Sequence, residues 1–321
     1  METAVTTAVR TQRKVAAGLE ELIGDTPLVR LAVTGAAPGA EVLAKLESAN
    51  PFASSKDRAA LAMLRGAEER GDLAPGSTVV ESTSGNTGIA LAAMAARRGY
   101  RCIVVLPDSA TPERIRLLTA LGAEVVQTPS AERFAGAIAK AEEIQAATPR
   151  SWYVRQHENP DNVRAHYEST GPEIWADTGG RVDVLVVGVG TGGTLTGAGR
   201  YLRERNPDLR IVAVEPENSP VLSRGFAGTH RIPGLNGGFV SPTTDVSLID
   251  EVITCPDEAA LATALALVRE QGLFAGVSSG AAVYAAVILA RRPESAGKTV
   301  VTILPDTGER YVSIFNEGHS S

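Results

Sequence analysis

The sequence predicts an α/β protein, and two patterns support this fold class. Short apolar runs alternate with longer segments of helical periodicity along nearly the whole chain, which is typical of α/β domains. Several of these runs are continuously apolar, such as VDVLVVGV at 182–189, as expected for parallel strands that helices cover on both faces. With 321 residues, the chain is long enough for about two domains.

The elements can be assigned in chain order from these patterns. We expect strands in the apolar runs EVLAKLE (41–47), TVVES (78–82), RCIVVLP (101–107), AEVVQ (123–127), VDVLVVGV (182–189), RIVAVEP (210–216) and TVVTILP (299–305). Helical patterns lie between them at 57–71, 86–99, 111–122 and 192–206. The last three end at Gly or Asn, a common helix stop. The segment 146–180 is richer in polar residues, Pro and Gly, and we expect two lobes to meet there.

The composition excludes several classes of protein. Hydrophobic residues make up 44% of the chain and charged residues 21%, a normal mixture for a soluble globular protein. The net charge of −6 argues against a nucleic-acid-binding surface and, more weakly, against binding to anionic membranes. No run of apolar residues is long enough to span a bilayer, and the first residues lack the apolar core of a signal peptide. We therefore expect a cytoplasmic protein.

The cysteines and histidines indicate no metal site. Cys102 and Cys255 each lie in an apolar segment, and we expect two buried structural thiols. Neither their spacing nor that of the four histidines matches a zinc motif or a disulfide framework.

The loop GVGTGGT, at 188–194, follows an expected strand and opens an expected helix. Glycines there let backbone N–H groups approach an anion, to which the helix N-terminus adds its dipole. Thr191 and Thr194 can add hydroxyl donors, so the loop predicts a phosphate cradle. The same loop also satisfies G-x-G-x-x-G, with Glu215 near the end of the next strand. A nicotinamide-dependent oxidoreductase is therefore a competing interpretation.

Two further loops precede expected helices. In ESTSGNTG, at 81–88, four hydrogen-bonding side chains surround Gly85, namely Thr83, Ser84, Asn86 and Thr87. A helix cap needs one such residue, so we expect this loop to hold a carboxylate. In GVSSGAA, at 276–282, Ser278 and Ser279 are weaker candidates, because two serines can simply cap the following helix.

Lys56 lies in NPFASSKDR, at 50–58, and is one of only five lysines. Taken alone it would be an ordinary surface lysine. A phosphate cradle, an anion-binding loop and a lysine distant from both have one economical explanation, which is a phosphate-bearing aldehyde that forms a Schiff base with the lysine. Pyridoxal 5'-phosphate (PLP) fits this description.

These motifs also carry a family resemblance. Through NPFASSKDR, ESTSGNTGIALA, GVGTGGTLTG and GVSSGAA the chain resembles the fold-type II PLP enzymes, which share the fold of the tryptophan synthase β subunit. Within them it resembles the cysteine synthase (O-acetylserine sulfhydrylase) and cystathionine β-synthase family. The resemblance runs from about Leu22 to about Ser313. It implies two lobes, each a mainly parallel twisted sheet flanked by helices.

The resemblance also implies roles for individual residues. Lys56 would form the Schiff base and act as general base. Asn86 would bind the 3'-oxygen of PLP, and Ser278 would face the pyridine nitrogen. The phosphate would lie against Gly190, Thr191, Gly192, Gly193 and Thr194. The substrate carboxylate would be bound by Thr83, Ser84, Gly85, Thr87 and Gln156, and the loop 234–238 would border the entrance.

The implied reaction is a β-replacement. A cysteine synthase would convert O-acetylserine and sulfide to cysteine and acetate through an α-aminoacrylate. The alternative is a specialised relative that uses O-phosphoserine or serine, or a nucleophile other than sulfide, as cystathionine or diaminopropionate synthases do. An NAD(P)-dependent oxidoreductase explains only 188–193 and Glu215.

The resemblance further implies how the chain divides into two lobes and which partners it binds. Residues 50–157 would form a smaller mobile lobe, and 1–49 with 158–321 the larger lobe that holds the PLP phosphate. A homodimer is expected, and serine acetyltransferase is a possible partner.

Two residues depart from the family pattern. Ser55 stands where Val or Met is usual, and His157, which stands where Phe or Tyr is usual, is either a polar neighbour or a contact for the leaving group or nucleophile.

Overall fold

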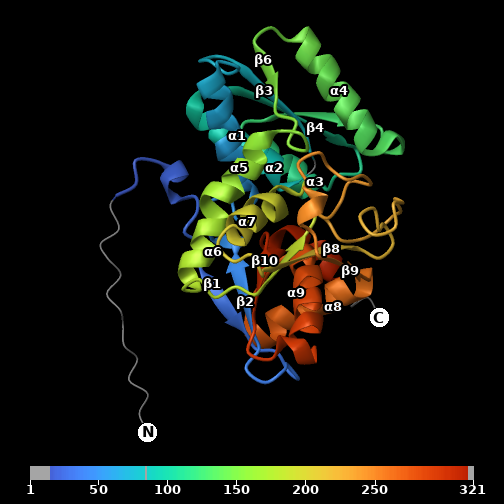
Figure 1. The fold of residues 1–321 in the computed structure, drawn as a ribbon. Helices are drawn as coiled ribbons and strands as arrows, with labels where there is room; N and C mark the ends of the chain where they lie inside the picture. Colours follow the sequence, from blue (N-terminus) through green and yellow to red (C-terminus); the bar gives the residue numbers. More distant parts are fainter. Residues whose placement is uncertain (1–14, 84, 317–321) are drawn as a thin grey trace.

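The computed structural model describes residues 15–83 and 85–316 and shows two sheets covered by helices (Figure 1). In the larger, six-stranded sheet, β1 runs antiparallel to its neighbour and the other strands are parallel. Its strands, in spatial order, are β1 (Leu28–Leu31), β2 (Glu41–Leu46), β10 (Thr299–Leu304), β7 (Val184–Gly188), β8 (Arg210–Pro216) and β9 (Glu251–Cys255).

The smaller sheet has four strands, all parallel. Their spatial order is β5 (Glu124–Thr128), β4 (Arg101–Pro107), β3 (Thr78–Ser82) and β6 (Ser151–Tyr153). Every residue of β3 is buried. The α/β class with parallel sheets, predicted from continuous apolar runs, is confirmed.

Helices lie on both faces of each sheet. Those of the smaller sheet are α1 (Lys56–Arg70), α2 (Asn86–Arg98), α3 (Pro112–Ala120) and α4 (Arg133–Ala147). The later part of the chain adds α5 (Pro160–Ala165), a π-helix (His166–Thr170), α6 (Gly171–Asp177), α7 (Gly193–Arg203), α8 (Asp257–Gln271), α9 (Val277–Ala290) and α10 (Val312–Asn316). Short 3₁₀-helices occupy Leu19–Leu22, Glu47–Ala49, Ser130–Glu132, Val246–Leu248, Pro293–Ser295 and Gly308–Tyr311.

The packing explains the continuous apolar runs. On β7, Val184 and Val186 pack into a core with α8 and α9, whereas Leu185 and Val187 face α6 and α7. The same division occurs in the smaller sheet, where one core contains side chains of α1 and α2 and the other those of α4. Because successive side chains of a strand point to opposite faces, a strand with helices on both sides is apolar throughout.

All seven expected strands are present within two residues of their expected bounds. The three missed strands, β1, β6 and β9, lie at sheet edges and are only partly buried. The segment 146–180 contains β6, α5, the π-helix and α6, and its helix α5 packs against both α1 and α7.

Cys102 and Cys255 are buried free thiols, as expected. Among residues 15–83 and 85–316, no helix combines the length and apolar character needed to cross a bilayer.

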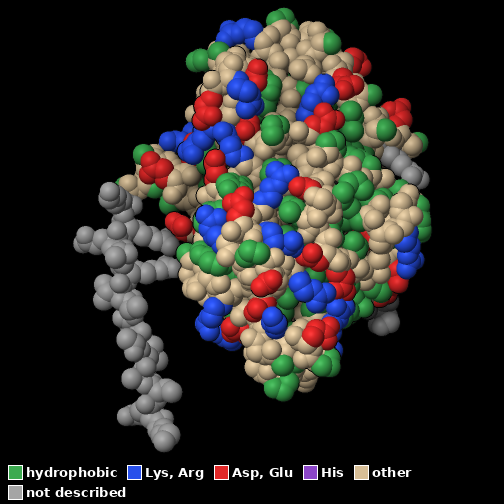
Figure 2. Space-filling view, viewed as in Figure 1, with side chains coloured by type: hydrophobic (Ala, Val, Ile, Leu, Met, Phe, Trp, Pro, Cys, Tyr) green, Lys and Arg blue, Asp and Glu red, His purple; other side chains and the backbone are tan. Residues whose placement is uncertain are grey.

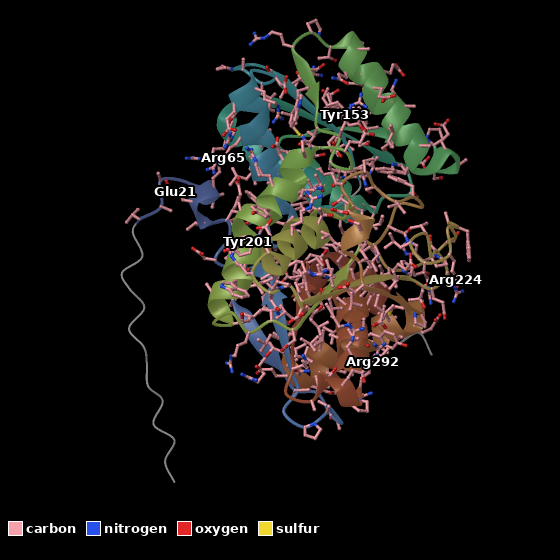
Figure 3. The ribbon with its side chains drawn as sticks, viewed as in Figure 1. Glu21, Arg65, Tyr153, Tyr201, Arg224 and Arg292 are labelled. Carbon is pink, nitrogen blue, oxygen red and sulfur yellow. The ribbon has the colours of Figure 1, made fainter. Side chains whose placement is uncertain are left out.

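Acidic and basic side chains are interspersed over the face drawn in Figure 2. Many pair across elements, as Arg98 does with Glu20 at 2.6 Å and Arg292 with Glu251 at 2.6 Å. Figure 3 shows Arg292 far from Tyr153, which belongs to the smaller sheet at the other end of the molecule.

Candidate active site

Lys56 is the first residue of α1, and a compact turn holds it in place. The carboxyl group of Asp57 accepts hydrogen bonds from the Phe52 backbone N–H at 2.6 Å and from the Ser54 hydroxyl at 3.1 Å. Ser55, directly before the lysine, is buried and donates its N–H to the Pro305 carbonyl at 2.8 Å. The turn thus fixes the start of α1 against the end of β10.

Lys56 has no ion-pair partner within 4.0 Å among the described residues. Burial lowers the pKa of its ammonium group, although nearby carboxylates, that of Asp306 above all, oppose this shift. A lysine in such surroundings has an increased fraction of neutral amine, the form that reacts with aldehydes and accepts protons.

A cavity of about 280 Å³ contains Lys56 and brings the three loops together. It is lined by the predicted residues Lys56, Thr83, Gly85, Asn86, Thr87, Gln156, Gly190, Thr191, Gly192, Thr194 and Ser278. Gly193 does not line it, because it starts α7 and packs against Asn162. Ser84 lies outside the described residues. The structure therefore gathers these residues in one place, while their individual roles remain predictions.

The glycine-rich loop is shaped for close approach of its backbone. A Cβ atom on Gly190 would lie 2.3 Å from the Gly234 carbonyl oxygen, and one on Gly192 would lie 1.9 Å from Oγ1 of Thr244. Gly192 also has a φ of +82°, a conformation that favours glycine. Only glycine fits at these two positions. The loop leads directly into the N-terminus of α7, a type of site that favours anions.

His166 supports this loop and was missed from the sequence. This buried side chain lies in the π-helix, with its Nε2 3.1 Å from Oγ1 of Thr194 and its Nδ1 2.8 Å from Oγ1 of Thr170. Burial holds the pKa of His166 well below its ordinary value, so the ring is neutral. If Nε2 carries the proton, His166 donates to Thr194 and leaves the Thr194 hydroxyl free to donate to an anion. A histidine without a motif offers no sequence signal for this contact.

The loop before α2 has its own supporting groups. Thr87 donates its hydroxyl to the side-chain oxygen of Gln156 at 2.6 Å, and the Gly85 N–H donates to Thr83 Oγ1 at 3.2 Å. Behind them, burial raises the pKa of Glu81 to about 8, although hydrogen bonds from Gln156 and Arg155 oppose the shift. The sequence places Glu81 in the expected strand 78–82 and at the start of the motif ESTSGNTG, but gives no signal for this shift of its pKa.

The third loop does not cap its helix with a side chain. Gly276 is the N-cap residue of α9, and no side-chain hydrogen bond caps the helix. Ser278, which is 4% exposed, instead lines the cavity.

The structure argues against the dinucleotide interpretation. Glu215 is fully buried, and its carboxylate accepts hydrogen bonds from the backbone N–H groups of Leu222 at 2.7 Å and Ser223 at 3.0 Å. The Ser223 hydroxyl donates to it as well, at 2.5 Å. The acid that would bind a ribose hydroxyl therefore holds a loop in place.

His157 lines the cavity within a small aromatic cluster. Its ring centroid lies 5.4 Å from that of Phe134 on α4 and 5.1 Å from that of Phe239. A hydrogen bond of 2.6 Å joins its Nδ1 to Oγ of Ser241. Burial lowers the pKa of His157 to about 4, and the charge of Lys56 adds to this shift. His157 is therefore neutral at pH 7.

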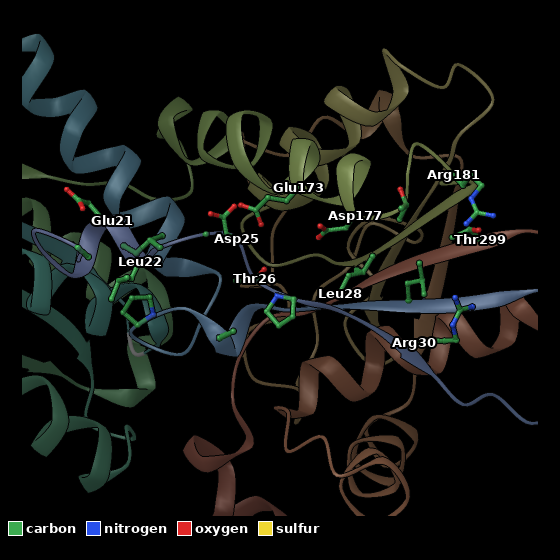
Figure 4. Close-up of a pocket in the computed structure, with 18 of the residues that line it drawn as sticks. Glu21, Leu22, Asp25, Thr26, Leu28, Arg30, Glu173, Asp177, Arg181 and Thr299 are labelled. Carbon is green, nitrogen blue, oxygen red and sulfur yellow. The ribbon is translucent and has the colours of Figure 1, made fainter. Parts of the chain in front are cut away.

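A second cavity, of about 1080 Å³, is larger but lacks this chemistry (Figure 4). Glu173 and Asp177 line it, and both pair with the buried Lys45, at 2.9 and 3.1 Å. None of the predicted site residues contributes to its lining. The residues that line the smaller cavity, rather than its volume, identify it as the candidate active site.

Lys56, which has no ion-pair partner among the described residues, shares one cavity with the glycine-rich loop at the start of α7. This combination is what an enzyme with a phosphate-bearing aldehyde cofactor requires. The comparisons agree. A model of the pyridoxal-phosphate dependent enzyme family matches residues 19–306, and the chain belongs to this family. PLP is thus the cofactor, and the donors present fit it.

Characterised relatives cover nearly the whole chain. Cysteine synthase A of Escherichia coli is 48% identical over 300 residues, which are 91% of this chain and 92% of the relative. The crystal structure of a cysteine synthase from Entamoeba histolytica superposes with a TM-score of 0.93 at 38% identity, covering 98% of this chain and 94% of the other. That of an O-ureido-L-serine synthase superposes with a TM-score of 0.91 at 42% identity, covering 96% and 97%. These matches confirm the predicted fold type.

Proposed function

We propose that this enzyme catalyses β-replacement on an activated serine, and specifically that it is a cysteine synthase converting O-acetylserine and sulfide to cysteine and acetate. The observation that carries the proposal is that Lys56, which has no ion-pair partner in the described part of the chain, shares one cavity with the loop before α2 and the loop before α7. The similarity to cysteine synthases over nine tenths of the chain supports the choice of reaction.

The chain's own residues divide the work. Lys56 takes the proton from Cα of the substrate, and its lowered pKa supplies the neutral amine that this step needs. When bound, PLP supplies an electron sink for the charge that develops at Cα. Ser278 offers a neutral hydroxyl to the ring nitrogen, and the start of α7, with Gly190 to Thr194, binds the phosphate.

The loop before α2 is proposed to bind the substrate carboxylate through Thr83, Ser84, Gly85, Thr87 and Gln156. The N-terminus of α2 adds its dipole to these donors. Residues 50–157 are proposed to move as one lobe over the bound substrate, which would keep water from the reacting carbon. A homodimer, a cytoplasmic location and a complex with serine acetyltransferase rest on the family resemblance alone.

A second candidate function has the same reaction chemistry with a different donor or nucleophile. His157 and Phe134 form part of the cavity wall, where a leaving group or nucleophile would approach, and the Phe239 ring packs against His157. The similar O-ureido-L-serine synthase structure supports a different product within the same fold. The donor would then be O-phosphoserine or serine, or the nucleophile would be other than sulfide.

The test is the visible absorption of the purified, PLP-loaded protein. O-acetylserine added without sulfide should shift the band, and sulfide should restore it with formation of cysteine. A yellow protein that does not respond to O-acetylserine would favour the second candidate. A colourless protein that cannot be loaded with PLP would contradict both.

A further inference from the structure

Asp306 is a buried acid at the candidate active site that the proposed mechanism does not use. It follows β10, is 2% exposed and lines the same cavity as Lys56. Its Oδ2 accepts hydrogen bonds from Nδ2 of Asn86 at 2.7 Å and from the Tyr311 hydroxyl at 2.5 Å. Its Oδ1 is buried and has no hydrogen-bond partner among the described residues. Such an arrangement costs free energy and calls for a functional explanation.

The contacts of Asp306 determine how the Asn86 amide is turned. Arg310 donates a hydrogen bond to Oδ1 of Asn86, and Asp306 accepts one from Nδ2. A guanidinium group can only donate and a carboxylate can only accept, so this pair admits one orientation of the amide. Nδ2 carries two hydrogens, and Asp306 uses one of them. The other remains available within the cavity.

Asp306 and Arg310 also contact the turn that carries Lys56. Arg310 also donates to the Phe52 carbonyl oxygen, four residues before the lysine. Asp306 forms an isolated antiparallel bridge with Ser54. The segment after β10 therefore ties together Asn86, at the start of α2, and the turn before α1.

We propose that Asp306 is a positioning residue that acts through Asn86. It holds the amide so that the second Nδ2–H is presented to the 3'-oxygen of the PLP ring. This inference rests on the proposed function, because it takes Asn86 as the partner of that oxygen. Asp306 itself need not touch the substrate.

A double-mutant cycle on cofactor binding tests the proposal. PLP is titrated into apo-protein, and the dissociation constant is read from the visible band for the wild type, Asp306→Ala, Asn86→Ala and the double variant. Asp306→Ala should weaken binding about tenfold, as expected for loss of one hydrogen bond to a charged group. In the Asn86→Ala background the same change should weaken binding less than about twofold, since the two residues act as one unit.

Two further variants separate positioning from folding. In Asp306→Asn, the amide oxygen takes the place of Oδ2 and still accepts hydrogen bonds from Asn86 and Tyr311. The NH₂ group takes the place of Oδ1, which accepts no hydrogen bond from the described residues, so no further contact is lost. Binding should therefore weaken only about threefold. Asp306→Leu keeps the branched shape without any hydrogen bond, and it replaces Asp306→Ala in the cycle if the alanine variant does not fold. Thermal unfolding of each apo-protein identifies such a case.

Glu309→Gln is the matched control, because Glu309 is an exposed acid in the same segment and does not line the cavity. It should bind PLP like the wild type. Additive effects of Asp306 and Asn86, or unchanged affinity in Asp306→Ala, would overturn the inference while PLP binding itself stands. If neither the wild type nor Glu309→Gln develops a visible band, the proposed function fails instead.

Discussion

Lys45 and Lys56 show how burial gives two lysines opposite uses. Nζ of Lys45 is fully buried, donates to the Thr26 carbonyl at 2.6 Å and pairs with Glu173 and Asp177. Its charge is compensated, so it contributes to structure. Lys56 has no such partner among the described residues, and burial favours its neutral amine. The physical difference lies in the surroundings, since the residue type is the same.

Replacing Lys56 removes the only group proposed to react with the cofactor aldehyde. Lys56→Ala should lose the visible absorption of the bound cofactor, and turnover should fall by at least about a thousandfold. Absorption spectra and initial rates of cysteine formation check this. Lys140→Ala is the control, because Lys140 is partly exposed, lies outside the cavity and pairs with Glu143 on the same helix. Full turnover in Lys56→Ala would rule out the mechanism.

His157 provides a second prediction at the residue scale. Its folded-state pKa of about 4 lies below the ordinary value of 6.5. The folded protein therefore binds fewer protons than the unfolded chain between these values, and stability present above pH 6.5 is lost as the pH falls toward 4. His157→Phe should reduce this acid sensitivity, measured as the free energy of unfolding at pH 7 and pH 4.5.

The same substitution should leave the shape of the activity profile unchanged between pH 6 and 8, because His157 is neutral throughout that range. If the wild-type profile shows an ionisation near pH 6.5 that is missing in His157→Phe, then His157 titrates during catalysis. The conclusion that His157 is a neutral, buried side chain would then be wrong.

At the scale of elements, the site is built from helix starts. α2 follows β3 and α7 follows β7, each at the carboxyl end of a parallel strand, while α1 and α9 contribute Lys56 and Ser278 from their first turns. Parallel sheets place ligands at these ends, where the positive ends of helix dipoles point outward. The arrangement therefore attracts a phosphate and a carboxylate without requiring many cationic side chains.

Gly192→Ala tests the loop between β7 and α7. A Cβ there would collide with Thr244 and would occupy a φ of +82°, so affinity for PLP should fall by about tenfold or more. Gly272→Ala is a matched control, because Gly272 has a φ of +68° but open space around its Cβ position. It should cost about 1 kcal/mol of stability and leave the affinity unchanged. Equal losses of affinity in both variants would show that strain alone accounts for the effect.

At the scale of the molecule, a buried ion network joins distant elements. Arg58 on α1 pairs with Glu47 at 2.7 Å and with Glu173 on α6 at 2.5 Å, and Lys45 on β2 completes the set. Burial opposes the charge on Glu173, but Arg58 and Lys45 outweigh it and lower the pKa of Glu173 to about 2. This network anchors the helix that carries Lys56.

Glu173→Gln tests the network through its pH dependence. A carboxyl whose folded pKa lies below its ordinary 4.5 contributes stability that is present above about pH 4.5 and lost as the pH falls toward 2. The variant should lose about 3 kcal/mol of unfolding free energy at pH 7, and the difference from wild type should shrink below pH 4.5. Denaturant unfolding at pH 7 and 3.5 measures it. Glu258→Gln removes an exposed acid and should change stability by less than about 1 kcal/mol at either pH.

The sequence by itself determined the α/β class, seven strands and most of the predicted site residues that line one cavity. The strands and the glycine-rich and hydroxyl-rich loops follow from local rules, because buried parallel strands are continuously apolar and anion loops need glycine and short hydroxyl side chains. The choice of Gln156 and the role of Ser278 came from the family resemblance. The edge strands β1, β6 and β9, which are only partly buried, escaped detection, whereas the partly buried edge strand β5 was predicted.

Only the tertiary structure decided which polar groups support the site. Asn86 and Asp306 are 220 residues apart in the chain, and Thr194 and His166 are 28 apart. No periodicity links such pairs, because a hydrogen bond depends on where the folded backbone brings two side chains. For the same reason only the structure showed that Lys45 is paired, that Lys56 has no ion-pair partner among the described residues, and that Glu215 holds a loop rather than a ribose.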